Sequence, residues 1–203
     1  MTDPVTHLLY LHGFRSSPQS SKARVMAAWV RQHRPELTWW CPQLPPSPAG
    51  AMQMLLEGIA HWPAAQTGVV GSSLGGFYAT AVAERLGCRA VLLNPAINPA
   101  RDLAKYIGET SGWHNDERFF FHPEFIDELH SMAPGELTRL DRYFAVIAMG
   151  DEVLDWREMN ARCEGCRIKL LAGSDHALSD FGTDLPDVLA FLGLKPPNSV
   201  TSG

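Results

Sequence analysis

The stretch G-V-V-G-S-S-L-G-G-F-Y-A-T, from Gly68 to Thr80, decides which fold the sequence indicates. It passes from an apolar run through a glycine-serine turn into a segment whose apolar residues have helical spacing. Residues 71–75 match the pattern G-x-S-x-G, and Ser73 stands at its centre. At the usual glycine content of about 7%, roughly one chain in fifteen of this length contains the pattern by chance. Its meaning therefore depends on its setting in the rest of the chain.

Six short apolar runs predict buried β-strands, because they are rich in Val, Leu, Ile and aromatic residues and do not alternate cleanly with polar ones. They are His7–Leu11, Leu37–Cys41, Gly68–Gly71, Ala90–Leu93, Tyr143–Met149 and Arg167–Leu171. Apolar residues three and four apart predict helices between them, at Ala23–His33, Ala49–His61, Gly76–Leu86 and Pro186–Leu192. Strands that alternate with helices predict a parallel sheet with right-handed crossovers. We expect an α/β three-layer sandwich with a mostly parallel six-stranded sheet in the order 2-1-3-4-5-6.

The length of the chain suits one domain over residues 1–203, because a chain of this size with 45% hydrophobic residues can bury a full core. The connection between the fourth and fifth predicted strands, residues 94–142, is much longer than a crossover needs. We expect a small helical insert at about residues 97–141. Its aromatic residues either form a lid or substrate wall or pack into the core, and both can hold; they are Trp113, Phe119, Phe120, Phe121 and Phe125.

The charge pattern argues against nucleic acid as a partner, because the net charge is −5 and the sequence has no long basic run. Four cations fall on a helix-like segment around Ala23–His33, and we interpret them as a solvated helix face: Lys22, Arg24, Arg31 and Arg34. The first residues lack the charged and apolar regions of a secretory signal. No run approaches the roughly 18 apolar residues of a membrane span. We therefore expect a cytoplasmic protein without a membrane partner.

The cysteine pattern does not indicate a metal or redox site. Cys163 and Cys166 form C-E-G-C, but no second pair completes a tetrahedral zinc site. A redox dithiol is typically found at the start of a helix that follows an early strand, whereas this pair precedes a late strand. We interpret both as loop cysteines without a function, and we expect no metal and no organic cofactor.

Residues with catalytic chemistry follow four of the predicted strands. Residues 11–14 (L-H-G-F) follow the first strand, Ser73 the third, residues 150–155 (G-D-E-V-L-D) the fifth and residues 173–177 (G-S-D-H-A) the sixth. Ligand sites in a parallel α/β sheet lie at the carboxyl ends of the strands. A serine, an aspartate and a histidine in this chain order are typical of the catalytic triad of the α/β-hydrolase fold, which we therefore expect here.

These residue types fit nucleophilic attack on a carbonyl group. The Ser73 hydroxyl needs a base that removes its proton, and histidine is the side chain that titrates near neutral pH, so His176 suits this role. Asp151 would orient the imidazole and stabilise its protonated form. The backbone N–H groups of Leu74 and Phe14 are the expected donors to the oxyanion.

Other residues compete for these roles. Asp155 replaces Asp151 if the loop folds differently, whereas Asp175 points away from His176 if the local chain is extended. Ser72 is off the centre of the pattern and is expected to face elsewhere. His12 is expected to be structural rather than a base.

Two further pairs have open interpretations. Ser16 and Ser17 either line the mouth of the pocket or cap a helix before Pro18, and serine is a preferred cap, so we favour the cap. Asn94 and Pro95 follow the fourth predicted strand as part of a wall or of a turn, and we favour the turn.

Longer motifs give the chain a family resemblance. The motifs are L-L-Y-L-H-G-F-R-S-S-P-Q-S-S-K-A, C-P-Q-L-P-P-S-P, V-G-S-S-L-G-G-F-Y-A-T, V-L-L-N-P-A and G-D-E-V-L-D. Over Leu8–Leu194 the chain resembles the YqiA-type bacterial esterases, which are small single-domain α/β-hydrolases. The resemblance implies a serine esterase, with Ser73, Asp151 and His176 as the triad and the N–H groups of Phe14 and Leu74 at the oxyanion. The chain departs from the family at C-E-G-C and, within the insert, around residues 112–114. The departure in the insert concerns the acyl-chain preference and not the chemistry.

The leading hypothesis is a serine esterase that hydrolyses small carboxylic esters, or acyl thioesters, through an acyl-enzyme intermediate. An acyl-CoA thioesterase or a peptidase would use the same residues, and turnover of matched substrates separates them. A binding protein on a hydrolase scaffold is the alternative of another class. The presence of all three triad residue types argues against it.

Overall fold

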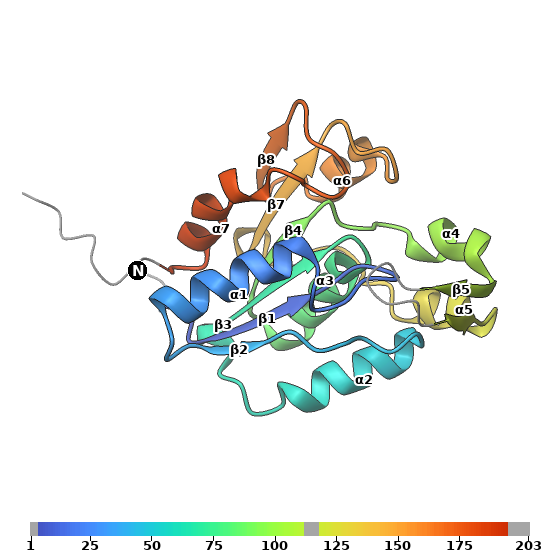
Figure 1. The fold of residues 1–203 in the computed structure, drawn as a ribbon, viewed down its shortest axis with the longest axis horizontal. Helices are drawn as coiled ribbons and strands as arrows, with labels where there is room; N and C mark the ends of the chain where they lie inside the picture. Colours follow the sequence, from blue (N-terminus) through green and yellow to red (C-terminus); the bar gives the residue numbers. More distant parts are fainter. Residues whose placement is uncertain (1–3, 112–117, 195–203) are drawn as a thin grey trace, which may run out of the picture.

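The computed structural model describes residues 4–111 and 118–194, and a parallel β-sheet forms its centre (Figure 1). The sheet has six strands in the order β2-β1-β3-β4-β7-β8, and every neighbouring pair is parallel. Their bounds are β1 His7–Leu11, β2 Thr38–Trp40, β3 Thr67–Ser72, β4 Arg89–Leu93, β7 Tyr143–Ala148 and β8 Arg167–Leu171. The predicted strand order 2-1-3-4-5-6 is confirmed, with β7 and β8 as its last two strands.

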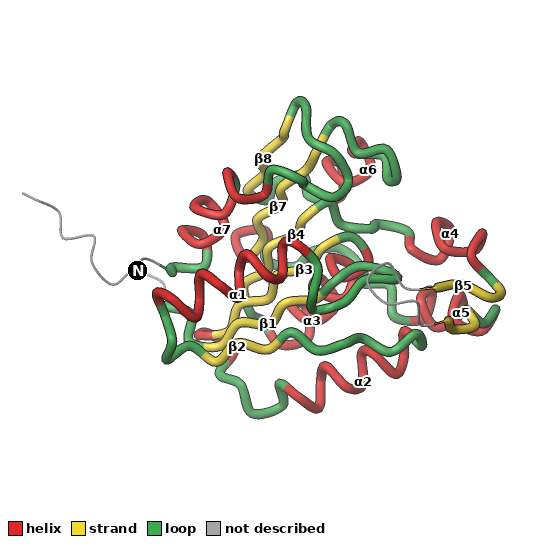
Figure 2. Tube along the Cα trace, viewed as in Figure 1, coloured by secondary structure: helices red, strands yellow, loops and turns green. Residues whose placement is uncertain are grey.

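Two apolar clusters cover the two faces of the sheet and make the fold three-layered. Alternate residues of a strand point to opposite faces, so Leu8 of β1 joins one cluster and Leu9 joins the other. Helices α1 (Ser21–His33) and α7 (Leu185–Phe191) contribute to the first cluster, and α2 (Pro48–Gly58), α3 (Leu74–Leu86) and α6 (Trp156–Arg162) contribute to the second. Figure 2 shows the helices on both sides of the yellow strands.

Helix α3 runs through the core rather than along the surface. All of its residues from Leu74 to Ala83 are buried. Small residues on α3 allow this packing, because Gly75, Gly76 and Ala79 leave room for the strands and loops beside the helix. The carboxyl end of β3 and the start of α3 are therefore held in one fixed place, where Ser73 joins them.

The insert between β4 and β7 contains strands as well as helices. It comprises α4 (Pro99–Leu103), the 3-10 helix η2 (Ala104–Tyr106), β5 (Gly108–Ser111), β6 (Arg118–Phe121), α5 (Glu124–Ser131) and η3 (Leu140–Arg142). β5 and β6 form an antiparallel pair apart from the main sheet (Figure 2). We expected a helical insert only; the aromatic run R-F-F-F favours a strand because aromatic residues suit a half-buried pleated surface.

Several element bounds differ from the sequence-based ones. Helix α6 was not expected; it begins after Asp155, whose Oδ1 accepts a hydrogen bond of 2.9 Å from the Arg157 N–H. Helix α1 begins at Ser21 after Ser20, so the expected cap at Ser16 or Ser17 is wrong. The Ser17 Oγ instead accepts from the Gln19 N–H in a local turn. Two short 3-10 helices, η1 (Ala64–Gln66) and η4 (Phe181–Thr183), complete the described elements.

The interpretation of four solvated cations on α1 is wrong for Lys22. This side chain is buried, whereas Arg24 and Arg31 are exposed; Arg34 lies just past the end of α1, with its side chain 19% exposed. Lys22 lies in the first turn of α1, where the helix faces the carboxyl edge of the sheet, and its Nζ donates to the carbonyl oxygen of Ala177. Helical periodicity could not show this, because the contact comes from the loop after β8.

All four cysteines are free thiols. Cys163 and Cys166 lie in the connection between α6 and β8, as expected, and Cys163 is buried in the core. Burial raises the pKa of the Cys163 thiol to about 12, which keeps it protonated and unreactive. Among residues 4–111 and 118–194, no group of three or more His, Cys, Asp or Glu side chains is arranged to hold a metal ion. In the same ranges, no helix is long and apolar enough to cross a membrane.

Candidate active site

Ser73 stands on a sharp turn between β3 and α3. Its φ of 56° lies in the left-handed region, which a residue other than glycine seldom adopts. Hydrogen bonds hold the turn: the Ser73 N–H donates to Leu93 at 3.0 Å, and the Ser73 carbonyl accepts from Gly76 at 2.8 Å and Ala96 at 3.0 Å. The surrounding backbone therefore maintains a strained conformation that exposes the hydroxyl at the edge of the sheet.

The two glycines of G-x-S-x-G are required by close backbone contacts. A Cβ atom on Gly75 would lie 2.0 Å from the carbonyl oxygen of Leu11, and one on Gly71 would lie 2.1 Å from that of Gly75. Such distances are far below van der Waals contact, so any side chain would push α3 away from β1 and β3. The spacing of the motif thus follows from the packing of this turn.

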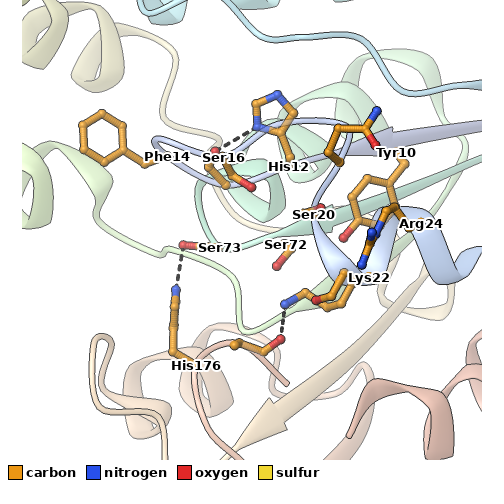
Figure 3. Close-up of a pocket in the computed structure, with 14 residues that line it drawn as sticks. Tyr10, His12, Phe14, Ser16, Ser20, Lys22, Arg24, Ser72, Ser73 and His176 are labelled. Carbon is orange, nitrogen blue, oxygen red and sulfur yellow. Dashed lines mark hydrogen bonds between the residues drawn. The ribbon is translucent and has the colours of Figure 1, made fainter. Parts of the chain in front are cut away.

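Ser73, His176 and Asp151 form a continuous hydrogen-bonded chain. The Nε2 of His176 lies 3.1 Å from the Ser73 Oγ, and its Nδ1 lies 2.8 Å from the Asp151 Oδ2 (Figure 3 shows the first of these contacts). The Asp151 side chain is fully buried, and its Oδ1 accepts from the N–H groups of Val153 and Leu154, both at 2.8 Å. This carboxylate places the imidazole proton on Nδ1, so Nε2 is the acceptor that faces the serine hydroxyl.

The competing acidic residues have other partners. Asp155 caps α6, as described above, and Asp175 accepts from the Ser179 N–H at 3.0 Å and from its Oγ at 2.7 Å. Both contacts serve local backbone geometry rather than the imidazole. The structure therefore places Asp151 against His176.

His12 has a structural position in the loop after β1. It is buried, its Nε2 accepts from the Leu44 N–H at 3.1 Å, and its Nδ1 lies 2.9 Å from the Gly13 carbonyl oxygen. Because Nε2 accepts, the proton lies on Nδ1 and is donated to Gly13. This imidazole joins the loop after β1 to the loop that follows β2.

The expected oxyanion donors lie on both sides of Ser73. Leu74 is the first residue of α3, and a Cβ on Gly13, which precedes Phe14, would lie 3.2 Å from the Ser73 Cβ. In the described part of the chain, neither the Phe14 N–H nor the Leu74 N–H donates a hydrogen bond to the protein. Neither N–H is thus committed to a protein acceptor among the described residues.

Asn94 makes contacts at the site that sequence reasoning missed. It is fully buried directly after β4, where the chain bends with a φ of 43°. Its Nδ2 donates to the carbonyl oxygens of Asp175 at 3.0 Å and His176 at 3.1 Å, and its Oδ1 accepts from Ala148 at 2.8 Å. Asn94 therefore holds the segment after β8 that carries His176 (residues 173–177, the histidine loop) against the sheet. Its position at a strand end was the available signal.

Two further hydrogen bonds hold the histidine loop in place. The His176 N–H donates to the Glu152 Oε2 at 3.0 Å, and Lys22 donates to the next carbonyl, that of Ala177. Glu152 belongs to the same loop as Asp151, so the aspartate and the histidine are held to each other by backbone as well as side-chain contacts.

Two cavities meet at Ser73 and His176. The larger, about 580 Å³, extends along the start of α1 and is lined by Ser72, Ser16 and Lys22, among others. The smaller, about 390 Å³, faces the insert and is lined mainly by apolar residues, with charges of both signs; the apolar ones include Leu74, Ala96, Leu103, Tyr106, Val153 and Leu154. Ser16 thus lies at a cavity, and Ser72 lines the larger one without bonding to His176.

The insert both packs into the core and walls the smaller cavity. The ring of Phe14 contacts the rings of Tyr106, Phe119 and Phe121, at centroid distances of 5.3, 6.1 and 5.2 Å. Leu103 and Tyr106 also line the cavity. The packing interpretation therefore holds for Phe119, Phe121 and Phe125. The insert residues that wall this cavity include Leu103 and Tyr106 but none of the described aromatic residues named from the sequence; Trp113 lies outside the described residues.

Several solved structures share this fold at low sequence identity. A protein from Agrobacterium vitis S4 has a TM-score of 0.74 and 17% identity, over 92% of this chain and 87% of that one. Alpha/beta hydrolase domain-containing protein 10 from mouse has a TM-score of 0.70 and 13% identity, over 94% and 92%. A structure from the metagenome-derived lipolytic enzymes LipS and LipT has a TM-score of 0.69 and 18% identity, over 95% of each chain.

These likenesses show that the molecule has the α/β-hydrolase fold. At the level of families, one model matches residues 7–193, which is nearly the whole described chain. It bears out the resemblance to the YqiA-type family drawn from the motifs. The chain belongs to the uncharacterised protein family UPF0227.

Proposed function

We propose that this protein is a serine hydrolase that cleaves small carboxylic esters, with acyl thioesters as related substrates. The observation that carries the proposal is the hydrogen-bonded chain Ser73–His176–Asp151 at the edge of the sheet. Structural neighbours that include lipolytic enzymes support hydrolysis as the reaction class. The alternative of a binding protein is disfavoured, because a strained serine, a correctly oriented imidazole and a buried carboxylate have no shared use in passive binding.

In the first half of the reaction, the Ser73 Oγ attacks the carbonyl carbon of the ester while the His176 Nε2 takes its proton. Asp151 stabilises the imidazolium through its bond to Nδ1. The negative charge that develops on the carbonyl oxygen is held by the N–H groups of Phe14 and Leu74. The tetrahedral intermediate then breaks its bond to the alcohol oxygen, which leaves with the proton from His176.

In the second half, a water molecule attacks the carbonyl carbon of the acyl group on Ser73, and His176 removes a proton from the water. The same two N–H groups stabilise the second tetrahedral intermediate. Its collapse releases the carboxylic acid and returns the proton to the Ser73 Oγ. The smaller cavity, with its mainly apolar lining, is the proposed site of the acyl chain. Its volume lies within the range of small-molecule sites.

Hydrolysis of 4-nitrophenyl esters of increasing acyl length, by the wild type and by Ser73→Ala, tests the proposal. We expect wild-type turnover and a loss of about 10⁴-fold or more in kcat for Ser73→Ala. Ser131→Ala is the matched control, since this hydroxyl lies at the end of α5 and donates to Glu128. Acyl-CoA and peptide substrates measured in parallel separate esterase, thioesterase and peptidase activity. Equal inertness of wild type and Ser73→Ala toward all of them would support the binding-protein alternative.

A further inference from the structure

The larger cavity beside Ser73 has a lining of one charge sign. Lys22 and Arg24 supply two cations, and the rest of its polar lining consists of hydroxyl, amide, imidazole and backbone groups, with no aspartate or glutamate among the described lining residues. In Figure 3, Ser73 and His176 lie on one side of the view, and Tyr10, Lys22 and Arg24 lie on the other. A group bound here would therefore reach from the reacting atoms toward the two cations.

Lys22 is a buried cation with unused hydrogen-bonding capacity. An ammonium group has three donors, and the carbonyl of Ala177 takes one. Burial lowers the pKa of Lys22 to about 8, while the charges of Asp175 and Asp151 act in the opposite direction. Both carboxylates are engaged elsewhere, with Ser179 and His176. Within the described ranges, no carboxylate forms an ion pair with Nζ. A buried charge without a close counter-ion is costly.

Two hydroxyls at the same cavity lack partners. Tyr10 is fully buried, and Ser20 lies beside it. Within the described part of the chain, neither the Tyr10 Oη nor the Ser20 Oγ makes a hydrogen bond of normal geometry, although the Ser20 hydroxyl lies close enough to Tyr10 to act on its pKa. Burial raises the pKa of Tyr10, so its hydroxyl stays protonated and able to donate. Buried hydroxyls are nearly always hydrogen-bonded in proteins, so an orphaned pair at a cavity indicates an acceptor that comes from outside the chain.

We propose that this cavity is a subsite for a carboxylate carried by the substrate, with Lys22 as its counter-ion and the hydroxyls of Tyr10 and Ser20 as donors. The single buried cation matches a single negative charge better than a phosphate monoester, which carries about −1.5 to −2. Arg24, exposed at the mouth, adds attraction without fixing geometry. This inference rests on the proposed esterase function and narrows its substrate class to acidic esters.

Matched substrate pairs that differ only in charge test the subsite. The first pair, 4-nitrophenyl hemiglutarate and its methyl ester, carries the carboxylate on the acyl part. The second pair, 3-butyryloxybenzoate and its methyl ester, carries it on the alcohol part. We expect the charged member of one pair to have a kcat/KM about 10- to 100-fold higher, as a charge-assisted hydrogen bond would give. The pair that shows this preference places the carboxylate on that part of the substrate.

Variants link the preference to the cavity. We expect Lys22→Met to abolish it and Tyr10→Phe, which removes only the orphaned hydroxyl, to reduce it several-fold. The readout is the ratio within a pair, so a general loss of activity from a shifted histidine loop cancels. Arg31→Gln, on the exposed face of the same helix, should leave the ratio unchanged. A wild-type ratio near one for both pairs, or a ratio that survives in both Lys22→Met and Tyr10→Phe, overturns the proposal.

A binding measurement separates failure of the subsite from failure of the proposed function. Monomethyl glutarate is titrated calorimetrically into Ser73→Ala and into the double variant Ser73→Ala/Lys22→Met. Binding that is lost with Lys22 supports the subsite even if no ester is turned over. Equal binding by the two proteins, or none by either, contradicts it whatever the esterase activity.

Discussion

The two cavities that meet at Ser73 are built from different parts of the molecule. The larger one is bordered by β1, by the start of α1 and by the histidine loop, all of which belong to the central sheet and its covering layer. The smaller one is walled by the insert and by the loop after β7. The first has cations and unpartnered hydroxyls, and the second has a mainly apolar lining. The proposed catalytic residues can thus serve two proposed recognition surfaces that are altered independently.

The largest effect we expect lowers kcat equally for substrates that use either cavity. Asp151→Asn should lower kcat by about 10⁴-fold for neutral and charged esters alike, because an amide favours the wrong imidazole tautomer and Nε2 can no longer accept the Ser73 proton. Asp155→Asn is the control, since asparagine also caps helices. Steady-state kinetics of the two variants decide the matter. Similar losses of kcat in the two variants would contradict the role of Asp151. A change in the charged-to-neutral ratio of kcat/KM with Asp151→Asn would contradict the claim that both kinds of ester use the same catalytic residues.

Asn94→Ala should give the next largest effect, again on both cavities. It removes the two hydrogen bonds that Asn94 donates to the histidine loop and leaves the Ala148 N–H without its partner. A misplaced His176 should lower kcat by about 10²-fold, with little change in KM. The unfolding free energy should fall by about 1–3 kcal/mol, because a buried polar group loses its partner. Kinetics and urea unfolding, with Asn160→Ala on α6 as the control, measure both. An unchanged kcat would rule out Asn94 as a positioning residue.

Val153→Trp should affect the smaller cavity alone. Val153 is 53% exposed and lines that cavity, so a larger side chain narrows it without disturbing the core. We expect about a 10-fold loss of kcat/KM for 4-nitrophenyl octanoate, little loss for the acetate, and an unchanged charged-to-neutral ratio. Val25→Trp, on the exposed side of α1, is the control. A changed ratio would show that the two recognition surfaces are not separate.

The smallest expected effect concerns the larger cavity and pH. Lys22 has its pKa lowered to about 8, so it is charged at pH 7 and loses its charge as the pH rises toward 9. The preference for the charged ester should therefore fall several-fold over that range. The groups that act on Lys22 are Asp151, Asp175 and the Ala177 carbonyl, with His176 on the same cavity. Because both substrates share the triad, the ratio isolates Lys22. Lys22→Met should give a flat ratio, and a flat wild-type ratio would contradict the assignment.

Sequence reasoning reached the features that are encoded locally. The G-x-S-x-G turn is one, because its glycines and its strand and helix lie within a few residues of one another. The six strands of the main sheet are another, because buried parallel strands have nearly continuous apolar sequences. Asp151 and His176 were selected by the rule that sites lie at strand ends.

The features that sequence reasoning missed depend on contacts between distant segments. Asn94 acts on residues 81 and 82 positions later in the chain, and Lys22 contacts a residue 155 positions later. Nothing in the spacing around either residue reveals its partner. The β5–β6 pair was missed for a related reason, since a short aromatic run in a long connection is compatible with either a helix or a strand.

Covalent labelling with a fluorophosphonate tests the central claim most directly, because this reagent reacts preferentially with an activated serine. We predict a single adduct in the wild type, seen by intact mass and mapped to Ser73 by peptide analysis. The adduct should be absent in Ser73→Ala and should form far more slowly in His176→Ala, while Asp155→Asn should label like the wild type. An adduct at Ser72, or labelling of Ser73 that is indifferent to the loss of His176, would contradict the proposed catalytic chain.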